Sequence, residues 1–189
     1  MIRARRIPGF IAAAFLVAAL SLAGSAAAID VTDPDYPRSL DQDGPVAVSW
    51  SDPAGFSEVR FSRNRFEARR GDWVRAIAKH LARRATAALA PGERLEVEIT
   101  DIKRAGEFEP AAGRSDHVRI VRDIYPPRID LSYTRFDASG QIVDSGAREL
   151  TDLGFLQRAG GTVAMGDALR HEKRLVDDWI RRDLSGRGD

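Results

Sequence analysis

One short segment constrains the fold of this 189-residue chain more than any other feature. Residues 95–100 read Leu-Glu-Val-Glu-Ile-Thr, so large apolar residues alternate with polar ones. Successive side chains of a β-strand point to opposite faces of its sheet. The alternation therefore predicts a strand with one buried face and one solvated face. A sheet of such strands packs a second layer on one side only, which predicts a two-layer domain.

Two amphipathic segments are predicted to form that second layer. The first begins at Gly71-Asp72 and ends before Pro91-Gly92, because apolar residues between them recur at helical spacing. Its apolar positions are Trp73, Ile77, Leu81, Ala85 and Ala88. The second helix is expected to follow Asp167, whose side chain suits a helix cap. Its buried side is expected to comprise Leu169, Leu175, Val176, Trp179 and Ile180.

The other strands follow from shorter patterns of the same kind. Strands are expected at 46–50, 118–124, 129–134 and 141–150, with a hairpin loop at 137–140. Segments 56–70 and 101–116 lack a regular apolar period and are expected to be loops, the first pinned by phenylalanines. This order predicts an α+β fold, a two-layer sandwich with two helices packed on one face of a four- or five-stranded mixed sheet.

The first 28 residues have the pattern of a secretory signal peptide. Three arginines precede an apolar run from Ile7 to Gly24, and the small residues Ser25-Ala26-Ala27-Ala28 follow. A transmembrane anchor is the alternative, but a spanning helix needs about 20 apolar residues, and this run is marginally short. We expect cleavage after Ala28 and a periplasmic product with no membrane span. Ser25 stands where a lipoprotein would need cysteine, so no lipid anchor is expected.

A single domain is expected to remain after cleavage. We expect a flexible acidic leader at 29–45, the domain at 46–184 and a disordered tail at 185–189. Loss of the three signal arginines changes the formal charge from +1 to −2, with 26 basic against 28 acidic residues. This balance argues against a nucleic-acid partner. The chain has no cysteine, which excludes disulfides and cysteine-based metal sites.

Three segments carry a resemblance to a known family. They are LEVEITDI at 95–102 running into AGEFEP at 105–110, VRIVRDIYPPRI at 118–129, and EKRLVDDW at 172–179. In this order and spacing they are similar to the bacterial domain-of-unknown-function family numbered 3016, over about 46–184. The resemblance implies an exported envelope protein of proteobacterial type and no established activity. The family pattern has an acidic residue and leucine where this chain has Lys103-Arg104.

One polar loop contains the candidate residues for catalysis. They are Asp101, Glu107, Glu109 and His117. Carboxylates and a histidine on one loop are the groups that acid–base chemistry or a divalent ion requires. The alternative is that they cap the loop and form ion pairs around a glycine turn. Asp116-His117 is not a metal motif, because histidine sites need two or three ligands at set spacing. No metal or cofactor is expected.

A neighbouring segment contains the candidates for binding a partner or an anionic ligand. They are Arg119, Arg122, Tyr125 and Arg128. Pro126-Pro127 fixes an extended backbone without amide donors. Such a segment would give a partner or an anionic ligand a rigid surface to bind. The alternative is a strand connection held stiff by proline and by arginine–carboxylate bridges.

Two functional hypotheses result. The leading one is a non-catalytic binding or accessory domain of the cell envelope, whose partner is an unknown envelope protein or a small ligand. The alternative is a hydrolase or metal-dependent enzyme with an acidic and histidine site in the 101–117 loop. The first is favoured because no nucleophile elbow or phosphate loop is visible in the sequence.

Overall fold

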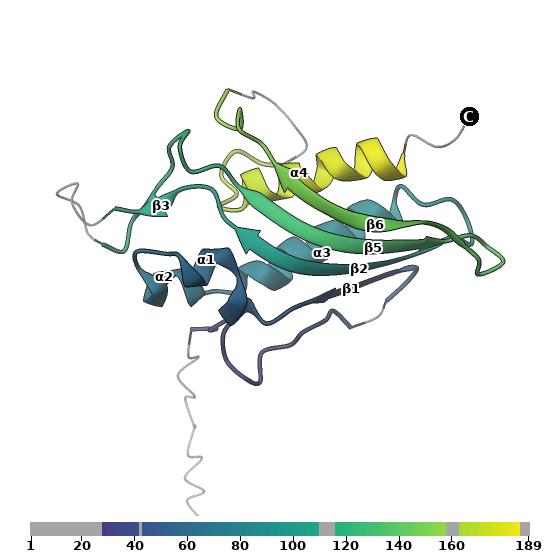
Figure 1. Cartoon of the computed structure of the whole chain (residues 1–189), viewed down its shortest axis with the longest axis horizontal. Helices are drawn as coiled ribbons and strands as arrows, with labels where there is room; N and C mark the ends of the chain where they lie inside the picture. Colours follow the sequence, from purple (N-terminus) through teal and green to yellow (C-terminus); the bar gives the residue numbers. More distant parts are fainter. Residues whose placement is uncertain (1–27, 42, 110–115, 158–162, 186–189) are drawn as a thin grey trace, which may run out of the picture.

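A four-stranded sheet forms one layer of the molecule in the computed structural model, which describes residues 28–41, 43–109, 116–157 and 163–185 (Figure 1). Its strands are β1 (Val46–Trp50), β2 (Arg94–Lys103), β5 (Arg128–Phe136) and β6 (Ile142–Thr151), in the order β1-β2-β5-β6. β1 is parallel to β2, and the other two pairings are antiparallel. The sheet is therefore mixed, as predicted. A second, two-stranded sheet pairs β3 (Glu107–Phe108) with β4 (Arg119–Ile120).

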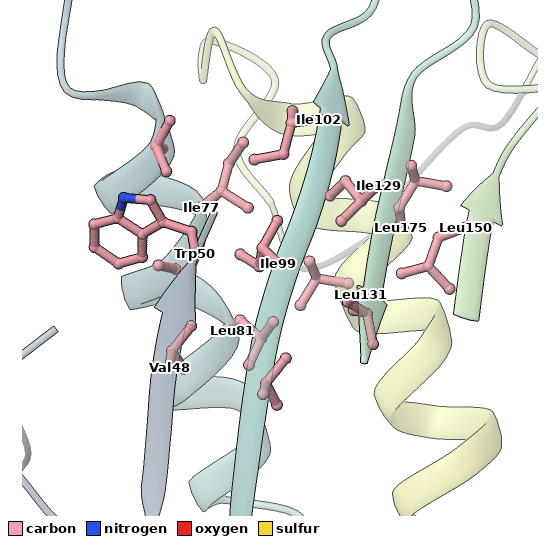
Figure 2. Close-up of a cluster of buried hydrophobic side chains, with 14 of the residues drawn as sticks. Val48, Trp50, Ile77, Leu81, Ile99, Ile102, Ile129, Leu131, Leu150 and Leu175 are labelled. Carbon is pink, nitrogen blue, oxygen red and sulfur yellow. The ribbon is translucent and has the colours of Figure 1, made fainter. Parts of the chain in front are cut away.

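Two helices form the other layer. They are α3 (Trp73–Thr86) and α4 (Arg170–Trp179), and α4 continues into the π-helical turn η2 (Ile180–Leu184). Their apolar sides meet the inner face of the sheet in one core, where Ile77 and Leu81 of α3 lie toward Ile99 of β2 (Figure 2). The predicted α+β two-layer architecture is confirmed.

The segment between β1 and α3 is more regular than expected. It forms the short helices η1 (Pro53–Gly55), α1 (Ser57–Arg60) and α2 (Arg65–Arg69). Of its phenylalanines, Phe56 is buried, whereas Phe61 and Phe66 are 65% and 54% exposed. Helices of four or five residues are too short to show an apolar period, so the sequence pattern resembled a loop.

β2 continues three residues beyond the point where a loop was expected to begin. The register between β2 and β5 shifts between Ile99 and Asp101, which marks a bulge. A bulge adds one residue to a strand and so breaks its alternation. Ile102 is consequently buried beyond the bulge, although the period of two predicts otherwise.

Residues 29–41 and 43–45 also differ from the expected flexible leader. Val31 and Tyr36 are buried in the core. The backbone N–H of Leu40 donates to Val48 at 2.9 Å, and that of Trp50 donates to Arg38 at 2.8 Å. The segment therefore pairs with part of the outer edge of β1. Its apolar residues are too few and too irregularly spaced to predict this packing.

The expected signal peptide lies outside the described residues, except for Ala28, and so does the tail at 186–189. Among the helices of the described segments, none is both long and apolar enough to cross a membrane.

Candidate functional site

Polar side chains gather in two regions that are built differently. The first is a group of charged residues at the end of β2, close to α1 and β3, where Figure 1 shows these elements together. We call Glu58, Lys103, Arg104, Glu107 and Arg119 the charge cluster. The second region is the side of the sheet that faces away from α3 and α4.

Glu58 of α1 is the centre of the charge cluster and is completely buried. Its carboxylate accepts hydrogen bonds from Arg104 Nε and Nη2, both at 3.1 Å, and from the Arg104 backbone N–H at 3.0 Å. It also accepts from Lys103 Nζ at 3.3 Å and from Arg119 Nη2. Burial alone would raise the pKa of Glu58, but the surrounding cations hold that pKa below its usual range. Three cations therefore compensate one buried anion.

The turn at Gly106 brings two of these cations into place. Gly106 has φ +82°, and a Cβ on it would lie 2.6 Å from the carbonyl oxygen of Ile120. The Gly106 carbonyl accepts from Lys103 Nζ at 3.0 Å and from Arg119 Nη1 at 2.9 Å. Its N–H donates to the Tyr125 carbonyl at 3.0 Å. Only glycine combines this backbone conformation with so close an approach of the β4 backbone.

A second buried glutamate lies beside the charge cluster. Glu172, in the first turn of α4, accepts from the Ala105 N–H through Oε1 at 2.6 Å. Its other oxygen, Oε2, is buried and has no hydrogen-bond partner among the described residues. Burial raises the pKa of Glu172, so its shift is opposite to that of Glu58. Glu172 ties α4 to the turn that carries the cations.

The predicted catalytic residue Asp101 lies at the edge of this region. It accepts from the Ser57 backbone N–H at 2.5 Å, from Ser57 Oγ at 2.6 Å, and from Arg128 Nη2 at 2.8 Å. Burial would raise the pKa of Asp101, but the Ser57 and Arg128 contacts lower it. Asp101 therefore holds the start of α1 against β2 and β5. Arg128, a predicted ligand-binding residue, is its ionic partner.

The other three predicted catalytic residues have separate partners. Glu107 belongs to the charge cluster, Glu109 pairs with Arg122 at 2.8 Å, and the exposed His117 lies 2.9 Å from Glu67 of α2. The structure thus distributes Asp101, Glu107, Glu109 and His117 over four different sets of contacts. Within the described ranges, no three histidine, aspartate or glutamate side chains are placed to hold a metal ion.

The predicted ligand-binding residues are engaged within the chain in a similar way. Arg119 bonds Glu58 and stacks over the Phe108 ring at 4.6 Å, and Arg122 pairs with Glu109. Tyr125 contributes its backbone carbonyl to the Gly106 turn. These contacts match the structural alternative considered for this segment, in which arginine–carboxylate bridges stiffen a strand connection.

The outward side of the sheet carries the second polar region. A hollow of about 560 Å³ lies over β1, β2 and β5. Its outward side chains form two rows across the strands, Ala47–Glu96–Thr134 and Ser49–Glu98–Ser132. We call these six residues the open face. It contains two carboxylates, three hydroxyls and no large apolar side chain.

A further carboxylate lies on the same side of the sheet as the open face. Asp130 precedes Ser132 and Thr134 at the same period of two along β5. Burial raises the pKa of Asp130; Arg128 opposes the shift, and the charges of Asp101 and Glu149 raise the pKa further.

Comparison with known proteins identifies the family but not a relative of known activity. No curated protein and no solved structure matches this chain significantly. The family model described as "Protein of unknown function (DUF3016)" matches residues 44–182. This match includes β1, the whole charge cluster and α4. The chain belongs to the DUF3016 family, as the three sequence segments indicated.

Proposed function

We propose that this chain is an exported, non-catalytic binding domain of the cell envelope and that the open face is its ligand surface. The observation that carries this proposal is the 560 Å³ hollow on the side of the sheet that the helices leave uncovered. In the charge cluster, by contrast, Lys103, Arg104 and Arg119 are all paired with Glu58 of the same chain.

The chemistry of the open face selects the ligand class. Glu96 and Glu98 lie two residues apart on one strand, so their carboxylates project from the same face. Ser49, Ser132 and Thr134 add hydroxyl groups that both donate and accept hydrogen bonds. Carboxylates at strand spacing, flanked by hydroxyls, suit an extended basic segment of a protein partner. An apolar ligand would find one large apolar residue beside these two rows, Leu40, which is partly buried against the core.

Export is the second part of the proposal and is supported by the sequence. The basic start, the apolar run and the small residues up to Ala28 occur in the order of a secretory signal. Cell fractionation of the tagged chain, with N-terminal sequencing of the product, tests this part. A product in the periplasmic fraction that begins at Ile29 is expected. A cytoplasmic product that retains residues 1–28 would contradict it.

Ligand binding is tested by titrating the purified chain with tetralysine and following backbone amide resonances. The peptide is expected to shift resonances of β1, β2 and β5 around the open face. The double variant Glu96→Gln/Glu98→Gln should weaken binding about tenfold, which corresponds to about 1.4 kcal/mol. The matched control is Asp41→Asn/Asp43→Asn, which removes the same charge from two exposed residues outside the open face.

The control variant is expected to retain affinity within about twofold, because its carboxylates do not face the ligand. Equal weakening by both variants would show attraction to net charge alone. Shifts confined to residues away from β1, β2 and β5 would place the ligand elsewhere. Either result would overturn the assignment of the open face.

A further inference from the structure

An exposed group of arginines and phenylalanines lies at the end of the sheet opposite the β5–β6 hairpin, on α1, α2 and the residues that follow each helix (Figure 1). Its members are all exposed to solvent: Arg60, Phe61, Arg63, Arg65, Phe66 and Arg70. We call these six residues the basic patch. Single apolar residues on a protein surface are ordinary, but two large rings among four cations need a reason beyond the fold.

The rings and the positive charges of the basic patch are held together. The guanidinium carbon of Arg60 lies 5.1 Å from the centre of the Phe61 ring. That of Arg70 lies 5.4 Å from the centre of the Phe66 ring. A cation over the face of an aromatic ring is attracted to it electrostatically. Arg65 Nη2 donates to the Arg60 carbonyl at 3.2 Å, which holds the start of α2 beside the end of α1.

The inner side of the same segment is anchored to the domain. Val59 and Ala68 are buried. The Ser62 hydroxyl donates to Glu107 at 3.3 Å, and Trp73 Nε1 donates to the Ala68 carbonyl at 3.0 Å. The two short helices are therefore fixed from behind, and the basic patch is the side that they present to solvent.

Positive charge is concentrated in this segment. Residues 60–70 contain five arginines and one carboxylate, Glu67. Glu67 pairs with Arg70 at 2.9 Å, and Asp30 pairs with Arg69 at 3.1 Å. The arginines still outnumber these two acids, whereas the chain without its first 28 residues has a formal charge of −2. An anionic surface is therefore attracted to this part of an otherwise acidic chain.

We propose that the basic patch binds the surface of an anionic lipid bilayer. Segments that lie on such surfaces combine arginines, which pair with the headgroups, and phenylalanines, which enter the boundary with the acyl chains. A small soluble anion would engage the arginines but leave Phe61 and Phe66 in water. A lipid surface accounts for both kinds of side chain.

The path of the chain supports a membrane as the occupant. The Gly71 N–H donates to the Ile29 carbonyl at 2.7 Å, and the Val31 N–H donates to the Arg69 carbonyl at 2.9 Å. The expected signal peptide thus joins the domain beside the basic patch. Residues 25–28 alone separate its apolar run from Ile29, a reach of roughly 18 Å. A run inserted in the membrane would keep the patch near the same surface. This step rests on the export part of the proposed function, and the other steps do not.

A tryptophan in place of Phe66 reports on insertion, because the three tryptophans of the chain are all buried. Its emission is expected to shift to the blue and to be quenched by vesicles of brominated phosphatidylglycerol, but not by vesicles of brominated phosphatidylcholine. The matched control is Ile142→Trp. Ile142 is 63% exposed and pairs with Phe136, at the end of β5 away from α1. The control should respond to neither kind of vesicle.

Charge variants made in the Phe66→Trp chain test the arginines. Arg60→Gln/Arg63→Gln should weaken binding to phosphatidylglycerol vesicles at least about tenfold, because each arginine near an anionic surface adds to the attraction. The control Arg181→Gln/Arg182→Gln removes the same charge from exposed residues of η2 and should keep the affinity within about twofold. All variants carry the same N-terminus, so residues 1–28, where retained, contribute equally.

Three results would overturn the proposal. Equal responses of Phe66→Trp and Ile142→Trp would show that the basic patch is not the part that meets the lipid. Equal weakening by the two arginine pairs would show attraction to net charge alone. Tighter binding of heparin or single-stranded DNA than of the vesicles would assign the patch to a soluble polyanion. None of these results depends on tetralysine binding at the open face or on the fractionation experiment.

Discussion

The charge cluster and the open face both take carboxylates or cations from β2, yet they use them in opposite ways. Glu58 is fully buried and meets three cations, which hold its pKa below the usual range. Glu96 has a side chain that is 57% exposed, and its nearest cation is Arg94 at 3.9 Å. The buried charges fix the fold, whereas the exposed ones remain available to a partner. A dense group of charged residues is therefore no guide to a binding site by itself.

The bulge of β2 separates the two regions. Before it, Glu96 and Glu98 follow the period of two and point to the open face. After it, the strand leads into Lys103 and Arg104, which turn toward Glu58. Because of one extra residue, the part of β2 before the bulge contributes to the open face and the part after it contributes to the charge cluster.

The largest effect is expected from Glu58→Gln. The variant keeps the size of the side chain but leaves three cations around a neutral group. Loss of one partner in a buried ionic group costs about 3–5 kcal/mol, and urea unfolding of the variant should show a loss of that size. The double variant Glu58→Gln/Arg119→Gln should lose less than the sum of its two single variants. A cost below about 1 kcal/mol for Glu58→Gln would mean that the cluster does not hold the fold.

Gly106→Ala is expected to have the next largest effect. Its Cβ would lie 2.6 Å from the Ile120 carbonyl, so the turn that carries the cations must shift. The control is Gly140→Ala, since Gly140 has a similar φ of +84° and nothing within 4 Å of its Cβ position. Both variants incur about 1–2 kcal/mol from the left-handed backbone. Thermal unfolding should show a further loss of about 1–3 kcal/mol for Gly106→Ala, and equal losses would contradict the close approach.

Glu172→Gln distinguishes the two buried glutamates by the sign of their pH dependence. Because the folded pKa of Glu172 is raised above 4.5, its contribution to stability is full below pH 4.5. That contribution is lost as the pH rises through the folded pKa. The variant carries no charge and lacks this loss, so it should gain stability relative to wild type between pH 4.5 and neutrality.

Urea unfolding at several pH values measures this difference. Glu96→Gln is the control, and its stability relative to wild type should stay nearly constant, because Glu96 is exposed. A Glu172→Gln variant that loses stability with rising pH would show that Glu172 is held as a carboxylate, like Glu58.

The two elements with the longest apolar periods were predicted correctly, and so were the strands expected at 46–50, 129–134 and 141–150. The alternation at 95–100 and the helical spacing in 73–85 are local patterns. The structure contains the strand β2 at the first and the helix α3 at the second. The alternation also indicated a solvated face at Glu96 and Glu98. What it did not indicate is that this face is hollowed.

The charge cluster could be predicted only in part, because it is assembled over long distances in sequence. Glu107 and Arg119 were among the candidates, but Glu58 and Glu172 were not. Glu58 is 61 residues from Arg119 and lies in a helix of four residues, where no period marks it as buried. Glu172 is 67 residues from Ala105 and reads as a polar position in an amphipathic helix. Contacts of this range depend on topology, which a single sequence does not encode locally.

The smallest effect on stability is expected from Glu96→Gln/Glu98→Gln, and that small effect is what makes the comparison decisive. Glu98 accepts an exposed hydrogen bond from Ser51 Oγ at 3.1 Å, and the cation near Glu96, Arg94, is exposed and 3.9 Å away. Exposed charges of this kind contribute little to folding, so the free energy of unfolding should change by less than about 0.5 kcal/mol. Paired urea unfolding of this variant and Glu58→Gln measures the contrast. A loss comparable to that of Glu58→Gln would mean that the open face is a structural region too, and its carboxylates would no longer be available for a ligand.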